Sequence, residues 1–453
     1  MEQKEKSQGS IKRPAKSWIV YISIVLVTVL LNVIAWNSTA FCDVYIAYVF
    51  PVWVNTYGRL TGLFPFSVGE WLIVAGILLV VLAILIGGAW AVTGLLKALY
   101  SFLLFRKDRG KPVGENGEEG GSFVSDVVNG DQRKHPLRKF AAVFYRFFAW
   151  TLLIVCVIMT LNCTILYHAS TFSENYFGEE TGDYSLEQFI KLYNFVASEC
   201  NRLSEEMVRD EAGQIVYAGN SGAETSDAVI AASGGKEDLD ALRNQMADEA
   251  IACMQKLGET YPQLDGWYPR PKPMMFSDLM CQQYMCGYYF PFSMEANYND
   301  VMYLMNKPAT FCHELAHLRG YIFEDEANFI AYLACLESED PVFQYAGYLS
   351  VINYLSNDLY KAYRDEKDLF IETVEKTGLV ALEEQVAEDN IFVEESEWDR
   401  INDKAVVDTE TVEEVSDTFT NTTLKLNGVS DGMVSYSRVV RLLLQYYAHI
   451  GEI

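Results

Sequence analysis

Histidine is scarce in this chain, with 5 residues among 453. A catalytic zinc ion takes three protein ligands and keeps one open position, so a shortage of imidazoles favours a carboxylate as the third ligand of any such site. Paired cysteine motifs are missing as well, because the nine cysteines include no repeated Cys-x-x-Cys. Any zinc site in this sequence is therefore expected to combine histidine with Asp or Glu.

Basic residues are scarce in the C-terminal two thirds of the chain. The chain has 35 Lys and Arg and 61 Asp and Glu. Residues 1–163 contain 16 of the basic and 10 of the acidic residues, so residues 164–453 contain 19 basic and 51 acidic residues, a net charge of −32. A segment this acidic, without a basic stripe, repels phosphate groups, and we therefore expect no nucleic-acid partner. The simplest reason for the acidic balance is a well-solvated surface.

Half of the residues are hydrophobic, and many of them form three long runs. Residues 17–36, 70–96 and 140–163 are each long enough to cross a bilayer core of about 30 Å, and we predict a transmembrane helix in each. Arg146 lies near the end of its run, where the side chain can reach the headgroups. Alternatively, the first run is a signal peptide, because Ser38-Thr39-Ala40 loosely resembles a cleavage site, and the other two runs would still anchor the chain.

The distribution of basic residues orients these spans. They cluster before the first span and between the second and third, and the positive-inside rule makes both segments cytoplasmic. We therefore predict a membrane domain over residues 1–163, with a cytoplasmic loop at 97–139, and an extracytoplasmic domain over residues 164–453. Seven cysteines fall outside the cytoplasm in this arrangement, where disulfides are permitted, and an odd number leaves at least one unpaired. The clustered basic residues are Lys4, Lys6, Lys12, Arg13, Lys16, Arg106, Lys107, Arg109, Lys111, Arg133, Lys134, Arg138 and Lys139.

Periodicity predicts a mainly α-helical protein whose C-terminal domain has a small β element. One helix is expected to be capped by Asp238 and to end at Gly258. Alternating aromatic residues predict a strand around residues 288–292. We expect an outer loop at residues 37–69, folded against the membrane surface, and a surface insertion at residues 210–236. Helices are predicted over residues 185–207, 238–257 and 341–362 and in much of 364–420. Residues 435–448 are too short and polar-faced to span a membrane, and we expect them to pack on the outer domain.

The most informative stretch runs from Phe311 to Leu336 (FCHELAHLRGYIFEDEANFIAYLACL). His313 and His317 are four residues apart, so on a helix both imidazoles lie on one face, where they can share a metal ion. The carboxylate of Glu314 is then free for proton transfer. The alternative is an ordinary amphipathic helix with its charged residues in solvent.

A corner and a second helix are predicted to follow this motif. Gly320 can adopt the left-handed conformation that ends a helix, so residues 318–323 are expected to form a tight corner before a helix that starts near Glu324. Glu324 is therefore the first candidate for the third ligand. Glu326, roughly 200° further round the same helix, is the alternative if this register is wrong.

The second helix resembles part of a known zinc site. Its sequence Glu324-Asp325-Glu326-Ala327-Asn328 is similar to the Glu-x-x-Ala-Asn/Asp pattern of the third-ligand helix in gluzincin-type zinc metallopeptidases. The resemblance implies that Glu324 ligates zinc and that Asn328 hydrogen-bonds a ligand histidine. Asn in place of Asp adds no negative charge, which implies a lower ligand basicity. In zinc peptidases an edge strand beside the metal helix holds the substrate, and by analogy we expect this role for the strand at residues 288–292.

A broader resemblance covers most of the chain, from the first span to the tail. Its motifs look like those of an uncharacterised bacterial family of membrane proteins, with a domain of unknown function predicted to be zinc-metallopeptidase-like. The family supplies no substrate. The motifs that carry the resemblance are PKPM (271–274), FPFSMEAN (290–297), HELAHLRGY (313–321), EDEANF (324–329) and LNGVSDG…SYSRVV (426–440).

The leading hypothesis is a membrane-anchored zinc metallopeptidase that acts outside the cytoplasm. Zn²⁺ held by His313, His317 and Glu324 would polarise the scissile carbonyl and lower the pKa of its bound water, while Glu314 passes the proton to the leaving amine. No other cofactor site is predicted. The expected partners are the lipid bilayer and a peptide or protein substrate.

Other functions stay open. One is a non-catalytic, zinc-containing receptor or cell-envelope assembly protein, and another is hydrolysis of a different extracytoplasmic bond, such as a cell-wall peptide amide. An intramembrane protease is disfavoured, because Arg319 and the acidic residues 324–326 leave no spanning apolar run around the motif. Tyr345 or Tyr348 is a candidate oxyanion donor for an enzyme.

Overall fold

The computed structural model describes residues 16–108, 136–178, 184–211, 213–217, 236–426 and 436–452. Within these ranges the chain is mainly α-helical, with three short strands. Three helices are long and apolar enough to cross a membrane, at Lys16–Asn37, Val68–Tyr100 and Lys139–His168. The predicted fold class, mainly α with three N-terminal spans and a small β element, is confirmed. Much of the predicted cytoplasmic loop and most of the predicted insertion lie outside the described residues.

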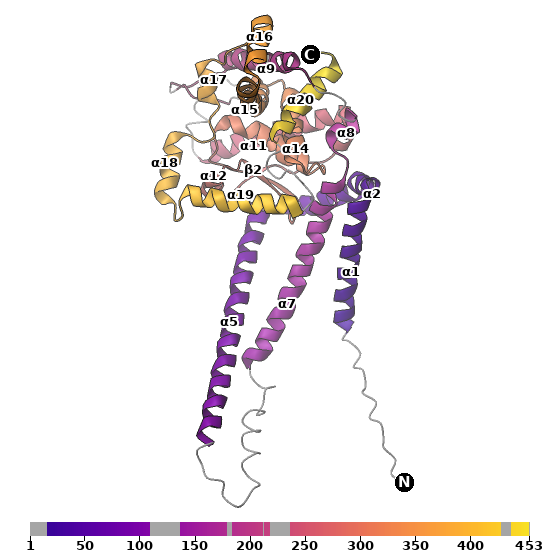
Figure 1. The fold of residues 1–453 in the computed structure, drawn as a ribbon, viewed down its shortest axis with the longest axis vertical. Helices are drawn as coiled ribbons and strands as arrows, with labels where there is room; N and C mark the ends of the chain where they lie inside the picture. Colours follow the sequence, from indigo (N-terminus) through magenta and orange to yellow (C-terminus); the bar gives the residue numbers. More distant parts are fainter. Residues whose placement is uncertain are drawn as a thin grey trace, which may run out of the picture. The chain divides into compact units, whose positions relative to one another are not determined.

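The chain divides into two compact units, and Figure 1 shows the elements of each. The first unit is formed by residues up to Val29 together with Trp71–Val157. The second unit is formed by Leu30–Glu70 together with Ile158–Ile453. The segment between the first two spans therefore belongs to the same unit as the C-terminal part of the chain, although the sequence suggested that it forms part of a separate membrane domain.

The first unit contains the long apolar helices α5 (Val68–Asp108) and α7 (Pro136–Met159) and the beginning of α1 (Lys16–Asn37). Aliphatic side chains of α5 pack against Phe144 and Phe148 of α7, and the Tyr145 hydroxyl donates to the carbonyl oxygen of Ala83 over 2.7 Å. Helix α5 continues past its predicted end at residue 96, because residues 97–105 contain no Gly or Pro that would end it.

Helix α13 (Lys307–His317) lies among the main helices of the second unit. It packs against α11 (Lys236–Thr260), α14 (Glu324–Leu336) and α15 (Pro341–Asp365). Helices α9 (Leu186–Glu206), α15 and α20 (Tyr436–Ile450) lie side by side (Figure 1). The predicted helices at residues 185–207 and 341–362 are confirmed. The C-terminal tail packs on this unit, as expected. The other helices of this part of the chain are α8 (Phe172–Tyr176), α9 (Leu186–Glu206), α12 (Ser277–Gln282), α16 (Lys367–Thr377), α17 (Glu384–Asp389), α18 (Glu395–Lys404), α19 (Thr409–Leu426) and α20 (Tyr436–Ile450).

Helix α11 does not end at Gly258, as the sequence suggested, but continues to Thr260. A Cβ at position 258 would lie 2.8 Å from the backbone nitrogen of Asp265. The glycine therefore permits a close approach between the helix and the following chain, and it is not a stop signal.

A three-stranded sheet packs against α13. Its strands are β1 (Lys272–Pro273), β2 (Gly287–Phe290) and β3 (Glu295–Tyr298), in the order β1-β3-β2. Strands β2 and β3 form an antiparallel hairpin, and β1 runs parallel to β3. Strand β2 is thus an edge strand beside the helix that carries the His-Glu-x-x-His motif. The sequence predicted β2 and missed β3, because the turn at residues 291–294 is hidden in a continuous apolar stretch.

The segment between the first two spans is folded, as expected, and residues 39–61 of it are helical, with turns at residues 62–66. Pro51 lies in the first turn of a helix, where proline is tolerated. Lys272 of β1 holds this segment to the sheet, because its ammonium donates to the carbonyl oxygens of Thr61 (2.8 Å) and Phe66 (3.2 Å) and pairs with Glu295 (2.6 Å). The helical pieces are α2 (Thr39–Val44), α3 (Phe50–Trp53) and α4 (Arg59–Thr61), joined by π-helical turns at Tyr45–Val49 and Val54–Gly58.

All nine cysteines are described, and none of them forms a disulfide. Six of the seven that were expected outside the cytoplasm are buried, and Cys286 is partly buried. They act as small apolar side chains in the core, so the second unit is held together by packing and not by disulfides.

Candidate functional site

Helix α13 presents two histidines on one face. Pro308 lies in its first turn, where the missing N–H is not needed. The opposite side is fixed by fully buried side chains such as Phe311 and Leu315. The ring centroids of His313 and His317 are 4.7 Å apart, and their Nε2 atoms are 3.1 Å apart.

A tight corner carries the chain from α13 to α14. Gly320 adopts a φ of +92°, and a Cβ there would lie 2.7 Å from the Cγ2 atom of Ile46, so both conformation and space require glycine. Helix α14 begins at Glu324. The predicted corner and the predicted start of the second helix are confirmed.

The corner places Glu324 opposite the two histidines. One carboxylate oxygen lies 3.0 Å from Nε2 of His313, and the other lies 3.8 Å from Nε2 of His317. One donor atom from each of the three residues lies within 4.8 Å of the others. The histidine side chains are 14% and 5% exposed and Glu324 is 59% exposed, so the cluster opens to its surroundings on the Glu324 side.

Glu326, the alternative third ligand, points elsewhere. Its buried carboxylate accepts hydrogen bonds from the backbone N–H (3.3 Å) and the hydroxyl (2.8 Å) of Ser173 in α8. Burial raises the pKa of Glu326 to about 7. The structure therefore brings together His313, His317 and Glu324, and it separates Glu326 from them.

Hydrogen bonds on the far side of each ring fix the histidines. Nδ1 of His317 donates to the carbonyl oxygen of Tyr321 over 2.7 Å, since a carbonyl can only accept. Nδ1 of His313 lies 2.9 Å from Oδ1 of Asn328, whose amide nitrogen donates to the hydroxyl of Tyr354. The contact with Asn328 is the one that the gluzincin resemblance implied.

This arrangement fits a divalent cation. With both Nδ1 atoms engaged as donors, the two Nε2 atoms, 3.1 Å apart, and the Glu324 carboxylate converge on one point, where a proton on His313 or a metal ion can offset the negative charge. Metal–ligand distances of about 2.0–2.1 Å in a tetrahedral site would give edges of about 3.3–3.4 Å, close to the separations observed. Two imidazoles and one carboxylate, with an open side, are a ligand set that suits zinc.

The charges of the site shift its pKa values. Burial lowers the pKa of His313, but the hydrogen bond and the charge of Glu324 outweigh it and raise the pKa to about 9. Burial lowers the pKa of His317 to about 4. Burial alone would raise the pKa of Glu324, but the hydrogen bond from His313 and the positive charges of both imidazoles lower it to about 2. In the metal-free protein at neutral pH, a proton on His313 therefore neutralises Glu324.

Glu314 lies buried beside these residues. Its side chain is almost fully enclosed, and Oε2 has no hydrogen-bond partner in the part of the chain that the structure describes. Burial raises the pKa of Glu314 to about 8. A buried carboxylate with an unpaired oxygen is costly for the fold, and such groups are more common at functional sites than elsewhere.

The edge strand β2 closes over Glu314 at Gly287. A Cβ at position 287 would lie 2.3 Å from Oε1 of Glu314. The sequence analysis did not single out Gly287, although an isolated glycine at the start of a strand signals a close approach of another group.

Replacing Gly287 by Ala should therefore displace Glu314. We expect Gly287→Ala to lower the free energy of unfolding by about 1–3 kcal/mol, as in other overpacked sites, while His313, His317 and Glu324 stay in place. Thermal unfolding and metal content of the full chain measure both effects. In a Glu314→Ala background the same substitution should cost much less, and an equal cost in both backgrounds would show that the strain does not involve Glu314.

The two tyrosines considered as oxyanion donors do not face the cluster. The Tyr345 hydroxyl is buried and donates to Asp389 over 2.8 Å, and the Tyr348 ring packs against Tyr332 at 5.7 Å. That expectation was wrong, because α15 turns this face into the core. Tyr288 of β2 adjoins Gly287 and is 39% exposed, so it is the tyrosine of the edge strand next to Glu314.

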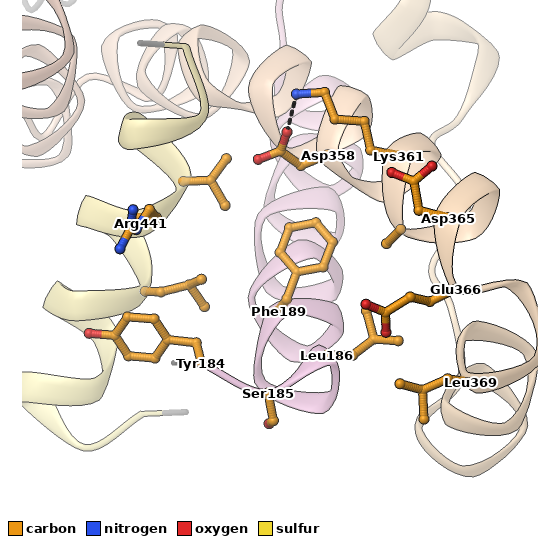
Figure 2. Close-up of a pocket in the computed structure, with 13 residues that line it drawn as sticks. Tyr184, Ser185, Leu186, Phe189, Asp358, Lys361, Asp365, Glu366, Leu369 and Arg441 are labelled. Atoms are coloured by element: carbon orange, nitrogen blue, oxygen red, sulfur yellow. Dashed lines mark hydrogen bonds and ion pairs between the residues drawn. The ribbon is translucent and has the colours of Figure 1, made fainter. Parts of the chain in front are cut away.

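A pocket of about 470 Å³ lies away from this cluster, between α9, α15 and α20. Figure 2 shows an apolar floor that includes Leu186, Phe189 and Leu369, with charged side chains such as Asp365 and Glu366 at its edge. Asp358 and Lys361 form an ion pair at the same edge (Figure 2). None of the histidines of the cluster lines it, so this pocket is separate from the candidate metal site.

Fold and site together define a mainly helical protein with three candidate membrane spans and a cluster of two histidines and one glutamate. Residues 123–444 match the family described as "Protein of unknown function (DUF3810)", and the chain belongs to this family. No curated protein matches the chain, and no solved structure matches it.

Proposed function

We propose that this protein is a membrane-anchored, zinc-dependent metallopeptidase that hydrolyses peptide bonds outside the cytoplasm. The observation that carries the proposal is the convergence of His313, His317 and Glu324 next to the buried, partly unpaired carboxylate of Glu314. A structural zinc site is usually closed by four protein ligands, whereas this cluster has three and is open on one side. The test is cleavage of a broad peptide library by the zinc-loaded full chain, with Glu314→Gln as the matched control.

The residues of the site have two roles, metal binding and proton transfer. His313, His317 and Glu324 would hold zinc, which supplies a Lewis acid for the scissile carbonyl and lowers the pKa of water. Glu314 accepts the proton of the attacking water and delivers it to the leaving amine.

The edge strand β2 suits an extended substrate. Its outer side has no neighbouring strand in the sheet, so its backbone groups there can pair with a peptide. Gly287 contacts Glu314 from this strand. A peptide that pairs with β2 would therefore run past the general base.

The orientation in the membrane is also part of the proposal. Basic residues flank the predicted spans on the N-terminal side and in the loop at 97–139, so we place both in the cytoplasm. Residues 37–67 and 170–452 pack in one unit, as expected if two spans separate them and both lie on the outer face. Labelling of single cysteines in intact cells should reach the C-terminal end and not the N-terminal end, and protection of the C-terminal end would contradict this orientation.

Zinc affinity should depend on pH through His313. Its pKa of about 9 in the metal-free protein means that a proton must leave before the imidazole can bind a metal. We expect the apparent affinity to rise about tenfold per pH unit from about pH 6 to pH 8, more slowly up to about pH 9, and then to level off. His317, with a pKa of about 4, adds nothing in this range. Competition with a chromophoric chelator measures the profile, and a flat profile would contradict a role for His313 as ligand.

A further inference from the structure

The candidate metal site lies one side chain away from the end of a membrane span. The Tyr289 ring packs beside the His317 ring at 5.8 Å. The hydroxyl of the same tyrosine lies 3.4 Å from the carbonyl oxygen of Asn162, inside the candidate span Lys139–His168. All three residues belong to the second unit.

The turn of the β2–β3 hairpin is held by hydrogen bonds to residues at the ends of the membrane spans or next to them. The Asn162 amide donates to the carbonyl oxygen of Pro291 over 2.8 Å, and the Thr61 hydroxyl donates to that of Ser293 over 2.7 Å. The Glu295 carboxylate accepts from the backbone N–H of Gly69 over 2.8 Å, at the start of α5. The edge strand that adjoins Glu314 therefore ends where membrane segments begin and end.

The corner at residues 318–323, which joins the helix of the two histidines to the helix of Glu324, also contacts residues next to the membrane spans. Gly320 touches Ile46, which lies between the first two spans. Phe323, directly before Glu324, packs edge to face against Tyr167 at a centroid distance of 5.4 Å, and Tyr167 belongs to the last turn of the third span. The exposed side of the cluster, at Glu324, is thus bordered by residues that follow a membrane helix.

Helix length places these contacts at the membrane surface. Residues 139–159 are 21 residues long, about 31 Å at 1.5 Å per residue, which matches a hydrocarbon core of about 30 Å. Asn162 is the 24th of the 30 residues of the candidate span, so it lies in the end of the span that extends beyond a hydrocarbon core of about 30 Å. Its side chain and that of Thr160 are buried and hydrogen-bonded to protein, as polar groups at this depth require.

The segment between the first two spans provides independent support. One side is buried in the second unit, through Ile46, Phe50 and Val54. The other side exposes a row of large apolar and aromatic residues, which is unfavourable in water and favourable at a membrane interface, where Trp and Tyr are enriched. The exposed residues are Val44, Tyr48, Val49, Val52, Trp53, Tyr57, Leu60, Leu63, Phe64 and Phe66.

We propose that the substrates are membrane-anchored polypeptides that are cut just outside the bilayer, within a few residues of the outer surface. The inference rests on the proposed peptidase function and adds the substrate class. A chain that leaves the bilayer beside the third span meets Glu324 and the edge strand without crossing open solvent. A folded soluble protein would have to press against the headgroups to reach the same groups.

The depth of the site can be measured without any activity. A fluorophore on Tyr288→Cys, in a Cys156→Ser background in nanodiscs, reports the position of β2. We expect nitroxide-labelled headgroups to quench it about as strongly as a label on Tyr48→Cys, and more strongly than one on Lys376→Cys, two positions that are 75% and 70% exposed. Quenching as weak as at Lys376 would overturn the inference and leave the peptidase proposal standing.

Cleavage provides the second readout. The probe is a single-span peptide followed by a mixed-sequence segment. The two parts are joined directly or through a Gly/Ser spacer of about 5 or about 30 residues, and these spacers have mean end-to-end distances of about 12 and about 30 Å. The local concentration at the surface falls about 15-fold between the two spacers, so we expect cleavage to slow by about that factor. Equal or faster cleavage behind the long spacer would overturn the inference. If no probe is cut faster by wild type than by Glu314→Gln, the proposed function fails, and the inference fails with it.

Discussion

Glu314→Gln is expected to keep its zinc and its fold while losing roughly 100- to 10,000-fold in turnover. Glutamine has the shape of glutamate, but its amide cannot accept a proton. The substitution also replaces a buried carboxylate with a neutral group, so the free energy of unfolding should not fall. Metal content, thermal unfolding and cleavage of the peptide library, all on the full chain, measure the three quantities.

A second buried glutamate provides the matched control. Glu326 is as enclosed as Glu314, but it bonds to Ser173 and does not face the histidines. Glu326→Gln should therefore leave turnover close to that of wild type. If wild type cleaves nothing across the library, and cells with Glu314→Gln behave like wild type, the protein is better described as a zinc-containing receptor or assembly protein.

Replacement of either histidine by Ala should abolish zinc binding. Loss of an outer hydrogen-bond partner of a ligand already costs about 10- to 100-fold in affinity, and loss of an imidazole leaves two protein ligands, so we expect a larger effect. The measurement is zinc content after dialysis against a buffered zinc concentration.

His449→Ala is the control for this experiment. This residue lies on α20 with its ring against Phe177, apart from the cluster, and its replacement should leave the zinc content unchanged. Full occupancy in both His313→Ala and His317→Ala would show that the ligands lie elsewhere in the chain.

The sequence predicted local features of the site well, because each depends on few neighbours. Four-residue spacing puts two imidazoles on one helical face in any α-helix, and Gly320 marks the corner by its conformational freedom. The start of α14 at Glu324 follows from that corner. Whether the cluster binds zinc stays a prediction.

Features that depend on distant contacts could not be predicted. Gly258 looked like a helix end and is instead a contact with the backbone of Asp265. Tyr345 and Tyr348 looked available, but the packing of α15 turns them into the core. The role of Gly287 depends on a side chain 27 positions later in the sequence, and no local pattern reveals such a pairing.

The bonds of Lys272 and Glu295 constrain the order in which the protein can be made. Lys272 finds its carbonyl partners in residues 61 and 66, and Glu295 finds backbone donors at residues 68 and 69, on either side of the point where the second span begins. These early residues are synthesised some 200 positions before the groups that bind them. The segment before the second span must therefore keep its inner face uncovered until the hairpin has been synthesised. The second unit cannot be completed by the C-terminal part of the chain alone.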